Sequence, residues 1–171
     1  MNKILNVLSV MLFMFLILSC SKNDEEYLKD FNNYGVILSN NDYDVNLNNG
    51  TIESDYFEIK DTLILSQKER LELAKLFFDN KINKPNDDVL VFNNDGTIIH
   101  PDITTSIEIK YFGNDKSTIT ISGFADSTKV RKEDIRYLRF ESKVYKLLNK
   151  NEKFKKIKKS IDLKEDDRVY L

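Results

Sequence analysis

The chain begins with a segment that limits what the remaining residues can fold into, because it has the pattern of a removable secretory signal. Lys3 supplies a positive charge, and the apolar run 4–18 that follows has only two polar interruptions. A transmembrane helix needs about 20 apolar residues, and this run is shorter. It ends at Cys20 and not at a cluster of charges. The pattern therefore predicts a signal peptide over residues 1–19.

The last residues of this segment, Ile17-Leu18-Ser19-Cys20, resemble the lipobox of bacterial lipoproteins. In that family the cysteine receives diacylglycerol, the signal is cleaved before the cysteine, and the new amino terminus is acylated. The resemblance implies that Cys20 is lipidated and becomes the first residue of the mature chain, since several acyl chains give stable anchoring where one is marginal. Two alternatives stay open: an uncleaved anchor helix, and an ordinary secretory signal followed by an incidental cysteine.

Residues 21–26, Ser-Lys-Asn-Asp-Glu-Glu, resemble the lysine-plus-acidic tag of surface-exported lipoproteins in some Gram-negative bacteria. The resemblance implies a place in the bacterial cell envelope, at the outer membrane, with exposure on the cell surface; retention on the periplasmic side is the alternative. A short charged run is also typical of solvated chain. We therefore expect residues 20–30 to be a flexible tether that begins with the lipidated Cys20.

Composition then describes the mature chain. Removing 19 of the 171 residues leaves 152, which suits a single domain with a hydrophobic core of its own. We expect this α+β domain to span residues 31–171. Cys20 is the only cysteine in the sequence, so its lipidation would leave a domain with no disulfide, thiolate metal site or cysteine nucleophile.

Hydrophobic periodicity predicts an α+β fold, with a small antiparallel sheet packed by one central helix and by C-terminal helices. Residues 27–55 are rich in Asn and Asp and are expected to be mostly loop, with one short strand near 34–38. Residues 56–65 have the aromatic and β-branched pattern of a strand. The broad similarity to small lipoproteins of Gram-negative surfaces likewise implies an α+β fold, without any activity.

The central helix has clear boundaries in the sequence. Ser66 and Glu69 match a capping box, in which each side chain accepts a hydrogen bond from the other residue's backbone N–H. Apolar residues at helical spacing then predict a helix over 67–81 with one buried side. Pro85 is expected to end it.

Two hairpins are expected between this helix and the C-terminal helices. Residues 89–92 and 97–99 are apolar and flank Asp95-Gly96, a pair that suits a tight turn because both residues tolerate a positive φ. Residues 105–112 and 117–123 alternate apolar and polar positions, which predicts a second hairpin with one buried face.

Candidate catalytic residues are few. His100 is the only histidine, so sites built from two histidines are excluded. His100-Pro101-Asp102 repeats the signature tripeptide of the J-domains of Hsp70 co-chaperones, but strand-like sequence flanks it, and we interpret it as a turn. We predict no catalytic residue and no cofactor, and a carboxylate-based hydrolase is the least favoured alternative.

One segment has part of a calcium-binding pattern. Asp42, Asp44, Asn46 and Glu53 occupy positions one, three, five and twelve of an EF-hand loop. Leu47 stands where the sharp turn of that loop needs glycine, and no helical pattern flanks the segment. We interpret it as a solvated loop and predict no metal site.

The charge distribution is uneven. Residues 129–159 contain 13 Lys and Arg against 4 Asp and Glu, whereas residues 21–128 contain 10 against 20. Apolar residues at helical spacing predict a helix over 132–149 and a second one through Ile161, with lysines facing outward. The basic helices 129–159 are a candidate contact for an acidic protein partner or for the anionic membrane surface, and a solvated helix face is the alternative. Nucleic acid is not expected at this location.

Together these patterns predict a lipid-anchored protein of the cell envelope that is a binding module and not an enzyme. Its membrane contact is the lipid on Cys20. The alternative function is that of an immunity or inhibitor lipoprotein, which neutralises a secreted toxin or hydrolase.

Overall fold

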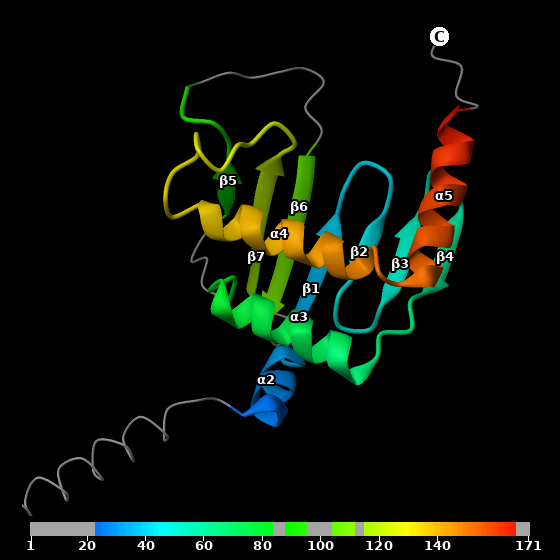
Figure 1. The fold of residues 1–171 in the computed structure, drawn as a ribbon, viewed down its shortest axis with the longest axis horizontal. Coiled ribbons are helices and arrows are strands. Elements are labelled where there is room, and N and C mark those ends of the chain that lie inside the picture. Colours follow the sequence, from blue (N-terminus) through cyan, green and yellow to red (C-terminus); the bar gives the residue numbers. More distant parts are fainter. Residues whose placement is uncertain (1–22, 84–87, 96–103, 112–114, 167–171) are drawn as a thin grey trace, which may run out of the picture.

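The computed structural model describes residues 23–83, 88–95, 104–111 and 115–166. This part of the chain has an α+β fold, as the sequence predicts, with one seven-stranded sheet and four helices (Figure 1). In chain order the elements are α2 (Asp24–Phe31), β1 (Tyr34–Ser39), β2 (Asp44–Asn46), β3 (Thr51–Ser54), β4 (Ile59–Thr62), α3 (Gln67–Asp79), β5 (Val89–Val91), β6 (Thr104–Tyr111), β7 (Asp115–Ser122), α4 (Ile135–Leu148) and α5 (Glu152–Asp166).

The sheet has the strand order β4-β3-β2-β1-β6-β7-β5. The hairpin of β6 and β7 confirms the one predicted at residues 105–112 and 117–123, and in it Ile107 lies opposite Ile119, with both side chains fully buried. β1 pairs antiparallel with β6 over all six of its residues. Segments far apart in the sequence therefore form the middle of the sheet.

The expectation of an antiparallel sheet is correct for six strands and wrong for β5. This strand pairs in parallel with β7, and Val91 lies beside Ile121. Asp95, in the turn of the predicted first hairpin, forms an ion pair with Lys129, and the N–H of Asn94 donates to the Lys129 carbonyl. The turn is thus held against the segment before α4. Its expected return strand, 97–99, lies outside the described residues.

Residues 27–55 contain more regular structure than expected. The strand near 34–38 is confirmed as β1, but β2 and β3 also form in this Asn-rich segment. The Asn side chains make the turns between these strands: Asn40 Oδ1 accepts from the N–H of Asp42 and Tyr43, and Asn46 Oδ1 accepts from the N–H of Asn48 and Asn49. Side-chain acceptors of this kind stabilise tight turns, which is why strands of three or four residues suffice here.

The expected tether over residues 20–30 is also corrected, because α2 begins at Asp24. Its N-cap is Asn23, which forms a reciprocal capping box with Glu26. At its other end Phe31 is buried and its ring packs edge-on against Phe77 of α3, with centroids 5.3 Å apart. The charged tag therefore runs into a helix of the folded domain.

Helix α3 starts as predicted. The Ser66 side chain accepts from the N–H of Glu69, and the Glu69 carboxylate accepts from the N–H of Ser66. The helix ends at Asp79, earlier than predicted, because Lys81 adopts a positive φ of 53°. The N–H of Lys81 then donates to Phe78 O and that of Ile82 to Phe77 O, which is the Schellman arrangement.

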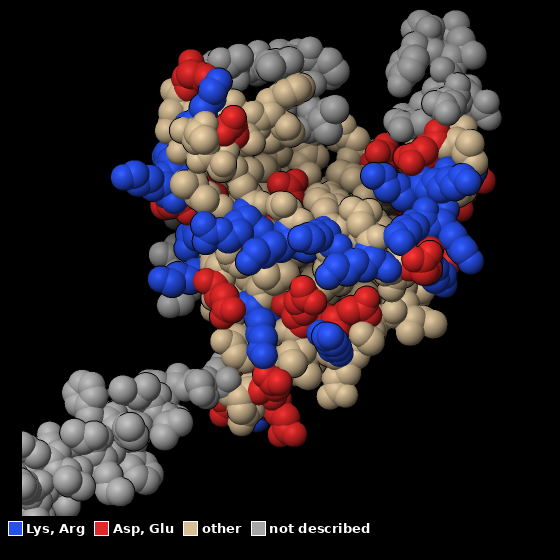
Figure 2. Space-filling model, viewed as in Figure 1, with Lys and Arg blue, Asp and Glu red and all other residues tan. Residues whose placement is uncertain are grey.

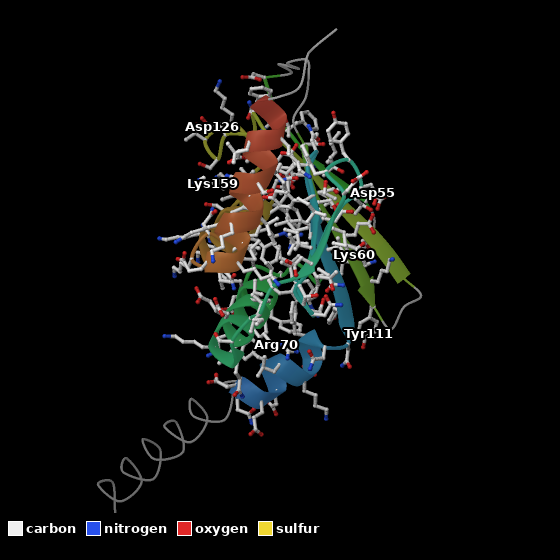
Figure 3. All side chains as sticks on the ribbon, turned by 90° about the vertical axis from the view of Figure 1, so that its right-hand side faces the viewer. Asp55, Lys60, Arg70, Tyr111, Asp126 and Lys159 are labelled. Atoms are coloured by element: carbon white, nitrogen blue, oxygen red, sulfur yellow. The ribbon has the colours of Figure 1, made fainter. Side chains whose placement is uncertain are left out.

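Helices α3, α4 and α5 lie on one side of the sheet, and α2 lies at the lower end of the molecule next to α3, as the two views in Figures 1 and 3 show together. The core lies between the helices and the sheet. It includes Phe77 of α3 and five buried residues of α4, which are Tyr137, Phe140, Val144, Leu147 and Leu148. The opposite face of the sheet has no described helix on it. Along β6 the partly exposed side chains, which point to this face, alternate with buried side chains that point to the core.

Helix α5 closes the outer edge of the sheet. Side chains at its start and near its end donate to three backbone carbonyls in and around β4: Lys153 Nζ to Thr62 O (2.9 Å), Asn151 Nδ2 to Ile64 O (3.1 Å) and Lys164 Nζ to Phe57 O (2.8 Å). Lys153 also forms an ion pair with Asp61. An edge strand exposes unpaired carbonyls, and α5 together with the preceding Asn151 supplies donors to Thr62 O in β4 and to two carbonyls beside this strand.

Candidate functional site

The structure describes only some of the candidate residues that the sequence indicated. Cys20 and His100 lie outside the described residues. In the segments that the structure describes, none of the helices has the length and apolar character needed to cross a membrane. The same segments hold no group of three or more His, Cys, Asp and Glu side chains that could bind a metal ion.

The partial calcium pattern lies in a β-hairpin and not in the solvated loop that we expected. Asp44 of β2 lies directly opposite Glu53 of β3, and Asp42 precedes β2 in the turn after β1. No helix flanks the segment on either side within the described chain. The four residues therefore share a sheet and a turn, an arrangement that differs from the helix-flanked loop of an EF-hand.

The basic segment carries exposed cations on both of its helices. Figure 2 shows Lys and Arg side chains in a band over α4 and in a second group over α5, with Asp and Glu side chains gathered over α3. Seven of these basic side chains are exposed and form no hydrogen bond or ion pair with the described residues. We call them the basic face: Arg139, Lys143, Lys146, Lys150, Lys156, Lys158 and Lys159.

Other cations of the same segment have partners inside the domain. Arg131 bonds the buried carboxylate of Asp134 at 2.7 Å. Arg136 bonds the hydroxyl of Tyr137 at 2.6 Å, and Lys153 bonds the β4 edge. These side chains stabilise the fold. The basic face is what remains for contacts with another molecule.

Helical spacing explains why several of these cations lie together on each helix. On α4, residues 139, 143 and 146 are three and four positions apart, so they share one side of the helix, opposite the buried Tyr137, Val144 and Leu148. On α5, Lys156 and Lys159 have the same relation to the buried Phe154 and Ile161. Unpaired like charges at this spacing repel one another, and an anionic partner would relieve that repulsion.

Two exposed apolar side chains flank the basic face. Ile64 is 83% exposed, and its carbonyl accepts the bond from Asn151 in the turn between α4 and α5. Leu163 is 58% exposed on α5. Periodicity did not identify either residue, because each lies outside an apolar stripe. Only their exposure in the folded domain distinguishes them.

A separate hollow of about 470 Å³ lies beside α4, between this helix and the segment 125–127. Its lining includes Ile135, Leu138, Arg139 and one carboxyl group, that of Glu141. Burial raises the pKa of Glu141, and a hydrogen bond with the Thr105 side chain offsets part of that rise. Among the described residues that line the hollow, Glu141 is the one that carries a carboxyl group.

The described chain is therefore a two-layer α+β domain with a basic helical face on one side and an open polar sheet on the other. Figure 3 shows this division, with Lys159 on the helix side and Asp55 and Lys60 on the sheet side. Comparisons with protein-family models, with curated proteins and with solved structures gave no significant match. The basic helical face and the open polar sheet are therefore the features that bear on function.

Proposed function

We propose that this chain is a lipid-anchored protein of the bacterial outer membrane, and that it is a non-catalytic binding module whose basic face binds an acidic protein partner. The observation that carries the proposal is the row of seven exposed cations without described partners on α4, α5 and the turn between them. A field of one sign on one face steers an oppositely charged partner and raises its association rate.

Anchoring rests on the lipobox at Cys20. Three residues separate Cys20 from Asp24, where α2 begins. A fully extended chain spans at most about 3.6 Å per residue, so the folded domain would start within roughly 15 Å of the lipid. Such a short connection would keep the domain at the membrane surface and limit the partners it meets to those near the bilayer.

The surroundings of the basic face favour a protein as partner over the bilayer itself. Protein interfaces combine an apolar centre with a charged rim, and Ile64 and Leu163 supply exposed apolar area beside the cations. The part of the domain nearest Cys20 has the opposite charge, since Asp24, Glu25 and Glu26 form the first turn of α2. An anionic bilayer would repel this turn.

A secreted toxin or hydrolase with an acidic surface would be one such partner, which corresponds to the immunity or inhibitor alternative. Electrostatic steering suits an inhibitor that has to bind quickly at the envelope. Rescue of cells from a toxin encoded beside this gene would support that assignment. A lack of rescue would exclude the immunity function. Binding by the basic face is tested separately in the experiments below.

Anchoring is tested with Cys20→Ala. The variant should move from the membrane fraction to the supernatant and should lose incorporation of labelled fatty acid, while a Cys20→Ser variant should behave in the same way. If membrane association and labelling are unchanged, Cys20 is not the anchor.

Binding is tested with a charge reversal on the basic face. In cells, a photo-crosslinker placed at Lys146 should capture a protein with an acidic contact surface, and a triple Lys143→Glu, Lys146→Glu, Lys156→Glu variant should lose it. A control with the same charge change elsewhere, Lys29→Glu, Lys68→Glu, Lys110→Glu, should retain it, because these lysines are exposed and lie outside the basic face.

With purified protein, an oligoglutamate peptide should bind the wild type and the control, and binding should weaken as salt concentration rises. Equal binding by both triple variants would contradict the assignment to the basic face. Binding to phosphatidylglycerol vesicles without any binding to acidic protein would show that the partner is the membrane.

A further inference from the structure

Two adjoining hollows lie beside β2 and β3, one over the open face of the sheet and one at the ends of these strands. One measures about 230 Å³ and is lined by Ile37, Asp44, Asn46, Asn49, Thr51 and Glu53. The other measures about 250 Å³ and lies at the ends of β2 and β3, between the β1–β2 turn at residues 40–43 and the β3–β4 turn at Asp55 and Tyr56. Asp44 and Glu53 line both hollows, so they form one polar trough with this carboxylate pair in the middle.

The amide groups in the trough are held in fixed orientations. Asn46 Oδ1 accepts two backbone N–H bonds, from Asn48 at 3.0 Å and Asn49 at 3.2 Å. Asn49 Oδ1 accepts from the N–H of Thr51 at 2.9 Å. With their oxygens engaged, Asn46 and Asn49 are left with side-chain NH₂ groups as donors. The trough therefore offers amide donors beside carboxylate acceptors.

Apolar contact is available at both ends. Ile37 lies next to Asn46 across the β1–β2 ladder. At the other end the ring of Tyr56 is 69% exposed and packs edge-on against the buried ring of Phe57, with centroids 4.9 Å apart. An exposed ring supported in this way is a flat surface on which an apolar face of a ligand can stack.

The backbone restricts the type of ligand. β2 and β3 are interior strands with neighbours on both sides, so a peptide cannot add to the sheet here as a further strand. A ligand has to be recognised by side chains alone. Each hollow is also smaller than the roughly 300 Å³ of a small-molecule pocket, so the trough suits an elongated ligand that lies across both.

The charge of the trough further limits the class of ligand that it can bind. Asp44, Glu53 and Asp55 line the trough, and the nearby cation Lys60 pairs with Glu53 at 2.9 Å. The remaining negative charge would repel acidic groups. Carboxylates and amides together can bond both the donor and the acceptor sides of hydroxyl groups, and an exposed ring and an aliphatic side chain can contact C–H surfaces.

We propose that this trough on β2 and β3 is a binding site for a neutral saccharide chain. It is separate from the basic face, which lies on the helix side, so a saccharide and an acidic protein can bind the domain at the same time. The site does not depend on lipidation of Cys20 or on the proposed protein partner.

The experiment uses the mature chain and an array of neutral, acidic and amino-sugar oligosaccharides, followed by NMR titration with the neutral trisaccharides that bind. We expect dissociation constants of about 1 mM or tighter and shifts of the Asn46 and Asn49 side-chain NH₂ resonances. Tyr56→Ala combined with Asp44→Asn should weaken binding at least tenfold. Lys110→Ser, a change on the same sheet face outside the trough, should leave binding unchanged.

Several results would overturn the proposal. They are an array with no neutral saccharide bound, shifts that map away from the trough, and binding that persists in the double variant. Binding of oligolysine without any saccharide would also overturn it, because the trough would then be a general cation-attracting surface. Binding of acidic saccharides as tightly as neutral ones would contradict the charge argument.

Discussion

Gly50 allows a stringent test of the structure, because it tolerates no side chain. Its φ is +79°, and a Cβ placed on it would lie 2.3 Å from Leu63 O, more than about 1 Å inside van der Waals contact. The left-handed backbone alone costs an alanine about 1 kcal/mol. Relieving the overlap would also separate the Leu63 N–H from Gly50 O, now 2.7 Å apart, at a cost of about 1 kcal/mol.

Leu63 is 2% exposed, so moving it also disturbs the core, and we expect Gly50→Ala to lower the free energy of unfolding by about 3 kcal/mol. For a domain of this size that corresponds to a fall in melting temperature of roughly 6–12 °C. The matched control is Gly35→Ala. A Cβ at Gly35 would meet Lys110 Cβ at 3.7 Å, an ordinary contact, and should change stability by less than about 1 kcal/mol.

Both variants should be unfolded in urea and followed by circular dichroism, with a form of the chain that begins at Ser21. The urea midpoints of the two variants should differ widely, at unchanged slopes. If Gly50→Ala and Gly35→Ala unfold at the same urea concentration, the close approach of Gly50 to Leu63 is wrong, and with it the path of the chain between β2 and α3.

Three further predictions concern stability. Lys81→Gly should stabilise the domain by about 1 kcal/mol, because glycine adopts the positive φ after α3 at no steric cost, whereas Lys81→Ala should not; equal urea midpoints for these two variants would contradict the Schellman assignment. Burial raises the pKa of Glu141 above its ordinary value of 4.5, so the folded state retains this proton to higher pH than the unfolded state. The contribution of Glu141 to stability should therefore decrease as pH rises from 4.5 through the raised pKa, and Glu141→Gln should gain stability relative to the wild type between pH 4.5 and 7 in urea titrations; a constant difference would count against it. Lys153→Met, which removes the donor to Thr62 O and the ion pair with Asp61, should unfold at lower urea than Lys158→Met, and the reverse order would argue against the closed β4 edge.

Local signals in the sequence predicted the elements whose stabilising contacts are local. The capping box of Ser66 and Glu69, the alternation in β6 and β7, and the helical spacing in α4 each depend on residues a few positions apart, and all are confirmed. The apolar run 89–92 predicted a strand, which is confirmed as β5, but the pairing of β5 with β7 could not be predicted in the same way. Its parallel partner β7 lies some 30 residues further along the chain, and no short-range pattern encodes that pairing.

The candidate surfaces could likewise be predicted only in part from the sequence. Composition located the basic segment, but it could not separate Lys153, which bonds the β4 edge, from Lys156, which is exposed without such a bond. Asp44 and Glu53 were noted for a calcium-like spacing, whereas their actual relation is that of cross-strand neighbours. The hairpin register, which places them side by side, depends on turns that Asn46 and Asn49 make and that spacing alone does not reveal.

The closed edge of β4 has a consequence for the behaviour of the protein at high local concentration. The three donors that close it belong to Asn151, Lys153 and Lys164, so they are all supplied by the last described helix and the turn before it. A proteolytic cut before Asn151 would remove all three at once, and we expect the β4 edge then to pair with the same edge of another copy. We therefore expect the intact C-terminal helix to limit edge-to-edge aggregation of neighbouring copies.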